Sequence, residues 1–444
     1  MYENNTTLMP VDIRHDKYLK PKLSKIGKIF LLILLIVIFE GAFRKWISSS
    51  LTNPIILFRD VIVIYGIYFS IKSGEVKVTQ FGIKILLFWT ALLFIWGLLQ
   101  LIINQTSILI FIVGTRFWLL YLWFAYVAAV SLNKYDFDFI AKVIVIVLLA
   151  MTPLTVMQHF LPPGAFLNKQ VDGDESTVFR VTADIVRTTG TFSFTSGYST
   201  LLAMSTPFIL AFLVPGTKLW NKKWMPKICV LVLAIATMVS GSRSAIVFFG
   251  VLFCIFVVII LLYSKRSKKG SAIGMILIVS LLLGLTPYFF SRSIDANLER
   301  FESASQGEDI YDRIISIFFG EPGIYKNFPL IGNGLGGGTN FAGVVATGER
   351  TFLLAETEAA RIILEGGLLG FVFIGLKLLV IVSGLRKSVF IAKIYGNILP
   401  LLLWVTTGLA LLSWSIIGQL TVNALGYLLL GLAIASLRLF FRKL

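Results

Sequence analysis

Long apolar runs follow one another along most of this chain. It divides into about twelve such runs, each near the ~20 residues that an α-helix needs to cross a bilayer. Hydrophobic residues make up 57% of the chain and charged residues only 14%, whereas soluble domains carry about 25% charged residues. So few charges cannot cover a water-exposed surface. The sequence therefore predicts an all-α polytopic membrane protein, with residues 1–444 forming a single integral membrane domain.

The predicted transmembrane helices follow the apolar runs directly. They are Ile26–Ile47, Pro54–Ile71, Phe81–Ile103, Ile108–Ser131, Phe137–Phe160, Tyr198–Val214, Trp224–Ser240, Ser244–Tyr263, Ala272–Phe290, Ala359–Leu385, Ile398–Ile417 and Leu420–Leu437. The first run follows a polar, basic tail and has no small-residue cleavage site after it. It is therefore predicted to be an uncleaved anchor.

The distribution of Lys and Arg between the runs predicts which side each connection faces. With the N-terminus inside, every inner segment is basic, as the positive-inside rule requires, although the turn with Arg44 and Lys45 opposes the rule. Both termini are therefore expected in the cytoplasm. Two long connections, Leu161–Gly197 and Ser291–Glu358, then form outer loops (residues 161–197 and 291–358). Long connections are uncommon unless they have a function.

The basic residues differ in type between the two predicted sides. The net charge of +17 does not indicate a nucleic-acid-binding protein, because the charges form short clusters between apolar runs. Lys predominates among the inner basic residues, whereas Arg predominates on the outer side and within the helices. Arg binds phosphate bidentately, so this pattern favours a diphosphate handled at the outer surface. The alternative is that these arginines snorkel to the interface and pair with acids.

Cysteine and histidine are too few for a disulfide framework or for a metal centre built from these residues. Cys229 and Cys254 both lie in apolar runs and cannot form a disulfide framework or a zinc site. The two histidines, His15 and His159, exclude a histidine-rich metal centre, and no cofactor is expected. His159 ends the fifth predicted helix and is interpreted as an interfacial residue, with a catalytic role as the alternative.

Several charged residues lie inside the apolar runs near their outer ends. They are Glu40, Arg59, Asp60, Arg116, Arg361 and Glu365. Charges are costly in lipid, so these residues are expected to face the bundle interior and mark a functional site, unless they pair structurally, as Arg59 could with Glu40. Glu358, Arg361 and Glu365 are spaced to share one helical face. A carboxylate there could accept a proton from a sugar hydroxyl, or the three could form a salt-bridge stripe.

A glycine-rich segment precedes the tenth predicted helix. Gly332, Gly334 and Gly336 belong to it, and it lacks the lysine that a nucleotide-binding P-loop requires. The segment is therefore predicted to turn tightly against a ligand or a neighbouring helix.

Four motifs together indicate a family. They are Arg187-Thr-Thr-Gly190-Thr191-Phe192, Ser240-Gly241-Ser242-Arg243, Asp312-Arg313 ahead of Phe328–Gly334, and Glu365-Gly366-Gly367-Leu368-Leu369-Gly370. In this order, on a chain of this hydropathy, they resemble the bacterial O-antigen polymerase and O-antigen ligase superfamily. The resemblance covers about Arg187 to Gly370, and the first five predicted helices match only in hydropathy.

The resemblance implies a reaction and a substrate. Members of this superfamily are metal-free glycosyltransferases that use undecaprenyl diphosphate-linked sugars at the outer face of the bacterial cytoplasmic membrane. Its ligases typically carry a histidine at the position that Glu356 occupies here, and no histidine lies in Leu161–Leu444. This departure favours a polymerase, whose acceptor is another lipid-linked repeat unit. Glu356 or Glu358 would then be the catalytic base that activates the acceptor hydroxyl.

The resemblance also implies roles for other residues and partners. Arg187, Arg243 and Arg313 would bind the diphosphate and stabilise its departure, with Arg116 and Arg361 as further candidates. Five residues are assigned to the structural motifs: Gly332, Gly334, Gly336, Glu365 and Gly367. The expected partners are undecaprenyl diphosphate-linked oligosaccharide and membrane lipid, with a flippase and a chain-length regulator as further candidates, and no nucleic acid.

Other functions remain open from the sequence. One is an O-antigen ligase-type transferase that uses another acceptor. Another is a lipid-linked oligosaccharide flippase, which would need a polar cavity open to both sides, whereas the acids and arginines gather near the predicted outer side. A polyprenyl-monophosphate glycosyltransferase typically carries an acidic pair in its first outer loop, and Arg44–Asn53 contains no acid.

Overall fold

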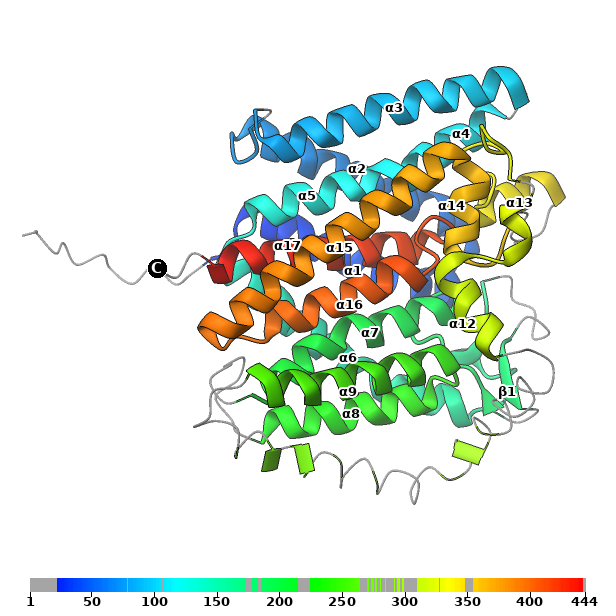
Figure 1. Cartoon of the computed structure of the whole chain (residues 1–444). Coiled ribbons are helices and arrows are strands. Elements are labelled where there is room, and N and C mark those ends of the chain that lie inside the picture. Colours follow the sequence, from blue (N-terminus) through cyan, green and yellow to red (C-terminus); the bar gives the residue numbers. More distant parts are fainter. Residues whose placement is uncertain are drawn as a thin grey trace, which may run out of the picture.

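The regular structure of the described chain is helical, apart from one short β-hairpin (Figure 1). The computed structural model describes residues 22–441 except 78, 105–106, 172–177, 183–184, 215–223, most of 264–309, 327 and 348–353. The first part comprises α1 (Lys25–Ala42), α2 (Thr52–Lys72), α3 (Phe81–Asn104), α4 (Ile108–Thr115), α5 (Tyr121–Ser131) and α6 (Lys134–Phe160). It is followed by β1 (Arg180–Thr182), β2 (Ile185–Val186), α7 (Thr195–Phe212), α8 (Met225–Val239) and α9 (Arg243–Tyr263). The last part comprises α12 (Ile310–Phe319), α13 (Asn340–Thr347), α14 (Glu358–Gly366), α15 (Leu368–Tyr395), α16 (Leu399–Ser413) and α17 (Leu420–Phe441).

Short helical turns complete the regular elements. The π-helical turns are η1 (Phe43–Ile47), which continues α1, and η3 (Arg116–Leu120), which joins α4 to α5. The 3₁₀ turns are η2 (Ser49–Leu51), η4 (Phe166–Asn168) and η6 (Pro322–Tyr325). A π-helical turn shifts the side chains that follow it around the helix axis and is frequent at functional sites.

Eight of the described helices are long and apolar enough to cross a membrane. They are Lys25–Ile47, Ser49–Lys72, Phe81–Ile103, Ile108–Ser131, Lys134–Phe160, Arg243–Tyr263, Leu368–Tyr395 and Leu420–Phe441. The chain is therefore an α-helical polytopic membrane protein, as predicted. Three further predicted spans correspond to α7, α8 and α16, which have 18, 15 and 15 residues. The predicted span Ala272–Phe290 lies largely outside the described residues.

The structure divides the predicted helix Ala359–Leu385 into two. Gly367 has φ 57° and ψ −127°, a backbone conformation that residues with a Cβ atom rarely adopt. A Cβ atom at Gly367 would also lie 2.2 Å from the carbonyl oxygen of Leu330. The chain therefore turns sharply here, so that only α15 is long enough to span a bilayer and α14 is a separate helix of nine residues.

The two ends of the described chain lie at the same end of the bundle. Asp136, in the capping box that begins α6, accepts hydrogen bonds from the backbone N–H and the hydroxyl of Ser24, at 2.8 and 2.7 Å. The Lys134 ammonium lies 4.3 Å from the ring centroid of Phe440, near the end of α17. The opposite end carries β1, α12, α13 and α14 (Figure 1), and it is called the loop end below.

Helix α7 lies at the centre of the bundle. It contacts α6, α8, α9, α16 and α17, and almost all of its residues are buried. The peripheral helices instead expose large apolar side chains, such as Tyr68 on α2, Phe88 on α3 and Leu379 on α15. Apolar side chains facing outward around a buried core are what a hydrocarbon solvent favours.

Candidate functional site

The two arginine motifs of the central chain lie against each other at the loop end. Arg187 directly follows strand β2, and Gly241 lies in the turn that joins α8 to α9. A Cβ atom built on Gly241 would lie 3.2 Å from Cγ of Arg187, so the turn packs directly on this arginine. Arg187 and Arg243 are both only partly buried. The structure thus brings the first two motifs together and leaves both side chains accessible from the loop end.

The segment Arg187–Phe192 is held rigidly by α1 and α6. The side chain of Gln158 accepts a hydrogen bond from the N–H of Gly190 at 2.8 Å and donates to its carbonyl at 3.2 Å. The Thr191 hydroxyl donates to the carbonyl of Ile38 at 2.6 Å. A bidentate amide and a buried hydroxyl bond fix the backbone from which Arg187 projects.

Lys45 anchors the same segment and was not singled out from the sequence. Its ammonium is buried and donates to the hydroxyl of Thr189 and the carbonyl of Gly190, both at 2.8 Å. The π-helical turn η1 presents it to the bundle interior. No signal in the sequence separates Lys45 from its neighbour Arg44, because the direction of each side chain depends on this local change of helix geometry.

His159 is buried at the end of α6 and binds backbone groups. Its ring hydrogen-bonds to the carbonyl of Val186 at 3.2 Å and to the carbonyl of Val239. These contacts connect α6 with strand β2 and with the end of α8. The geometry therefore gives His159 a structural role at the end of the helix, where it is buried and not exposed at an interface.

The turn between α16 and α17 connects the arginine motifs to α14. Gln419 accepts a hydrogen bond from Ser196, at the start of α7, at 2.6 Å. Ser415 accepts a hydrogen bond from Arg361 of α14. Sequence reasoning missed Ser415 and Gln419, and the signal that could have found them is the short polar break between two long apolar runs.

Arg361 is fully buried and positions the segment that precedes α14. Its Nη2 atom donates to the carbonyl oxygens of Ala355 and Glu356 at 2.9 and 3.1 Å. Its Nη1 atom lies 3.6 Å from the carboxylate of Glu358 and also donates to Ser415. Both Nη atoms of the guanidinium are therefore occupied by protein groups. This geometry favours a positioning role for Arg361 over direct contact with a diphosphate.

The two candidate bases lie in different surroundings. Glu358 is buried, its Oε1 atom lies 3.2 Å from the Lys377 ammonium, and its Oε2 atom accepts the N–H of Ile417 at 3.1 Å. Glu356 is exposed at the loop end, while its backbone is held by Arg361. Of the two carboxylates, only that of Glu356 is open to a substrate.

Glu365 binds the glycine-rich segment. Its carboxylate accepts hydrogen bonds from the N–H groups of Gly336 and Gly338, at 3.0 and 2.8 Å, and from the indole of Trp118 at 2.9 Å. Burial raises the pKa of Glu365 to about 7, while these hydrogen bonds and Arg361 act in the opposite direction. Glu365 is therefore a structural anchor for the segment.

The glycines allow this segment to contact two helices closely. Gly332, Gly334 and Gly336 all have positive φ angles, of 85°, 113° and 92°. A Cβ atom on Gly336 would lie 2.4 Å from the carbonyl oxygen of Ile110, near the start of α4. Gln100 of α3 adds hydrogen bonds to the carbonyls of Ile331 and Glu365, at 2.6 and 2.7 Å. Of the two sequence interpretations, the structure supports the close approach to a neighbouring helix.

Arg116 belongs to a charge network with Asp60, Arg59 and Glu40. It binds the carboxylate of Asp60 through two nitrogens, one of them at 2.9 Å. Arg59 lies 2.6 Å from Glu40 and is fully buried. These pairs correspond to the structural alternative predicted from the sequence. Because Asp60 occupies the bidentate face of Arg116, the geometry does not favour diphosphate binding by this residue.

Arg313 lies on α12, which contacts α14 and α16. Its side chain is outside the described part of the structure. The backbone thus brings the Asp312-Arg313 motif to the loop end, beside the other motifs.

Neither a search for metal-binding clusters nor comparison with known proteins assigns a function to these residues. Within the described residues, no group of three or more His, Cys, Asp or Glu side chains is arranged to hold a metal ion. No protein-family model, no curated protein and no solved structure matches the chain. The function is therefore argued from the site itself.

Proposed function

We propose that the protein is a polysaccharide polymerase of the O-antigen polymerase type. It transfers a glycan from undecaprenyl diphosphate to a lipid-linked repeat unit at the outer face of the bacterial cytoplasmic membrane. The observation that carries the proposal is the loop end itself. There the partly buried Arg187 and Arg243 lie in two contacting motifs, and the backbone of the exposed Glu356 is held at the same end by a hydrogen bond from Arg361.

The proposed chemistry is a single displacement at the anomeric carbon of the donor sugar. The acceptor hydroxyl oxygen forms a bond to this carbon, and the bond from the carbon to the diphosphate oxygen breaks. Glu356 takes the proton of this hydroxyl, because a hydroxyl is a weak nucleophile until a base removes its proton. The diphosphate leaves with the bonding electron pair.

Arginine can stabilise the departing diphosphate. Arg187 and Arg243, with Arg313 as a third candidate from α12, supply planar donor pairs that match phosphate oxygens. Fixed cations aimed at developing negative charge lower the barrier without further reorganisation. The rigid attachment of the Arg187 segment to α1 and α6 provides this preorganisation.

The proposal includes a membrane orientation. The loop end faces outward, both termini face the cytoplasm, and the chain crosses the bilayer about twelve times, in keeping with the positive-inside rule. A flippase and a chain-length regulator are the proposed partners. Epitope tags at Lys387 and Lys268 should then report the cytoplasm, and tags at Asp172 and Ser303 the outside; the last three sites lie outside the described residues.

The test is reconstitution of the purified protein in lipid vesicles with a lipid-linked repeat unit as the sole substrate. A polymerase produces a ladder of longer lipid-linked chains and releases undecaprenyl diphosphate. A ligase-type enzyme produces no ladder until a different acceptor is added. A flippase moves the unit across the membrane without changing its length, and either of these two results would refute the proposal.

A further inference from the structure

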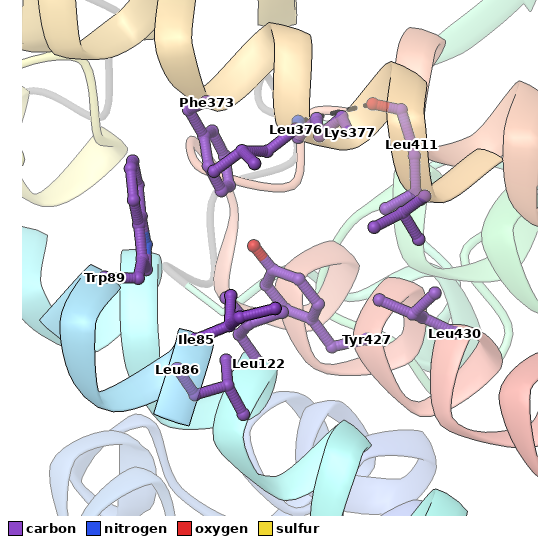
Figure 2. Close-up of a pocket in the computed structure, with 11 residues that line it drawn as sticks. Ile85, Leu86, Trp89, Leu122, Phe373, Leu376, Lys377, Leu411, Tyr427 and Leu430 are labelled. Atoms are coloured by element: carbon purple, nitrogen blue, oxygen red, sulfur yellow. Dashed lines mark hydrogen bonds between the residues drawn. The ribbon is translucent and has the colours of Figure 1, made fainter. Parts of the chain in front are cut away.

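A cavity of about 150 Å³ lies within the helix bundle, away from the arginine motifs. It is enclosed by α3, α5, α15, α16 and α17, and Figure 2 shows Trp89, Phe373 and Tyr427 around it. Lys377 lines it as well, with its ammonium directed to Glu358 and to the carbonyl of Leu411. The cavity therefore lies directly behind the ion pair that anchors the start of α14.

The cavity opens toward lipid. Most of its lining residues are buried, but Ile85 of α3 is 44% exposed and Val380 of α15 is 41% exposed. Both belong to helices that are long and apolar enough to cross a membrane. The opening between these two side chains thus faces the hydrocarbon of the bilayer.

Glycines hold α3 against its neighbours on both sides of this opening. Cβ atoms on Gly82 and Gly97 would lie 2.4 and 2.0 Å from side-chain atoms of Tyr126 and Phe111. These close contacts support the helix at both of its ends, while the cavity remains between them. The packing of α3 against its neighbours at Gly82 and Gly97 therefore leaves the opening between these two contacts.

The chemistry of the walls selects a hydrocarbon. The described lining side chains are aliphatic and aromatic apart from Lys377, whose charge is already paired, and the only other polar groups among them are the buried hydroxyl of Tyr427 and the buried indole N–H of Trp89. An apolar cavity of about this size stays dry and holds a molecule of roughly benzene's size, which is also about the size of one prenyl unit. Trp89 and Phe373 stack on each other, with their ring centroids 5.3 Å and their ring planes 14° apart, so they form one aromatic pair in the cavity wall.

Depth and position indicate which lipid chain can reach the cavity. Val380 is about 20 Å along α15 from the corner at Gly367, so only a long chain could reach the opening from the loop end. In Figure 1, α3 lies at the opposite side of the bundle from α8 and α9, which carry the Arg243 turn. A chain in this cavity therefore belongs to a lipid on the Glu356 side, away from the Arg187 and Arg243 motifs.

We propose that this cavity binds the prenyl chain of the lipid-linked acceptor unit, separately from the donor lipid. This inference rests on the proposed polymerase function, in which both substrates are lipid-linked. The acceptor sugar then meets Glu356, while its chain enters between α3 and α15. A second lipid site is what a polymerase requires and what a transferase with a water-soluble acceptor does not.

Val380→Trp tests the site, because it places a large side chain in the opening without changing the core. Val382→Trp is the matched control, since Val382 lies on the same helix, is 51% exposed and does not line the cavity. Ile85→Trp blocks the opening from the other side and guards against a folding defect in one variant. Gel filtration and circular dichroism of the full-length protein in detergent establish that each variant is folded.

The first readout is thermal stabilisation by undecaprenyl phosphate, which requires no transfer reaction. Because the proposed donor site also binds this lipid, we expect the stabilisation to be reduced but not abolished in Val380→Trp and Ile85→Trp, and to be unchanged in Val382→Trp. Stabilisation as large as that of the wild type in both blocked variants would overturn the inference. Equal stabilisation by phosphatidylglycerol would also overturn it, because the cavity would then hold bulk lipid.

The second readout is transfer to acceptors with and without a long prenyl chain. Loss of contact with about two methylene groups weakens binding roughly tenfold, so Val380→Trp should raise KM for the long-chain acceptor by at least that factor. The KM for an acceptor with a short chain should not change, and an equal rise for both would overturn the inference. If the wild type shows the thermal shift but transfers nothing, the polymerase proposal fails while a prenyl-chain site remains.

Discussion

Replacement of Arg361 by lysine distinguishes a positioning residue from a diphosphate ligand. The guanidinium donates to two carbonyls, of Ala355 and Glu356, and to the hydroxyl of Ser415. A lysine keeps the charge, but its ammonium cannot reach all three acceptors from one place. The lysine variant should therefore lose two hydrogen bonds from a charged donor. Each such bond contributes at least about 1.5 kcal/mol, so the free energy of unfolding should fall by about 3 kcal/mol.

Thermal unfolding of the purified protein in detergent, together with transfer kinetics, tests this expectation. Arg361→Lys should lower Tm by several degrees and reduce kcat, because Glu356 loses its fixed position. Arg386→Lys, at an exposed position on α15, is the matched control and should change neither quantity. An unchanged Tm with a raised KM for the lipid diphosphate would refute the reasoning and assign Arg361 to the substrate.

Substitutions at three other residues of the loop end should each change a different measured property. Arg243→Lys should reduce transfer roughly 100-fold with an unchanged Tm, because bidentate geometry matters there, and near-normal polymer length would exclude Arg243 from the diphosphate site. Gly336→Ala should destabilise the protein by more than about 1 kcal/mol, because φ at Gly336 is positive and a backbone oxygen would lie 2.4 Å from the added Cβ atom. Gly375→Ala is the control and should not destabilise the protein, because its added Cβ atom would have no neighbouring atom within 4 Å. The folded-state pKa of Glu365 is raised from 4.5 to about 7, so this residue makes the wild type more stable as pH falls from about 7 toward 4.5. Glu365→Gln should remove that pH dependence of Tm, and an equal slope in both proteins would contradict the assignment.

The helices were predictable because run length and hydropathy decide whether a segment can span a bilayer. The predicted helix Phe81–Ile103 corresponds to α3 at Phe81–Asn104, and Ile108–Ser131 has the same limits in the structure. The break at Gly367 was not predicted. Hydropathy averages over the residues of a window, whereas this break depends on one backbone conformation and on the packing of Leu330 against it.

The charged residues were predictable as a group but not individually. The spacing of Glu358, Arg361 and Glu365 predicted one helical face, and the ion pair between Arg361 and Glu358 agrees with it. Whether a carboxylate is accessible to a substrate depends on the side chains that bind it, and these come from residues distant in the sequence. Lys377 and Trp118 bind Glu358 and Glu365 respectively, and nothing in the local spacing indicates either contact.

A pair of isosteric variants tests the proposed role of Glu356 as the base of a polymerase. Glutamine keeps the shape and polarity of glutamate but accepts no proton at catalytic pH. The measurement supplies each purified variant in lipid with lipid-linked repeat units and follows product length on a gel. We expect Glu356→Gln to keep the wild-type Tm and to make no polymer, whereas Glu358→Gln should lower Tm because Lys377 loses its carboxylate partner. Long chains from Glu356→Gln at the wild-type rate would contradict the claim.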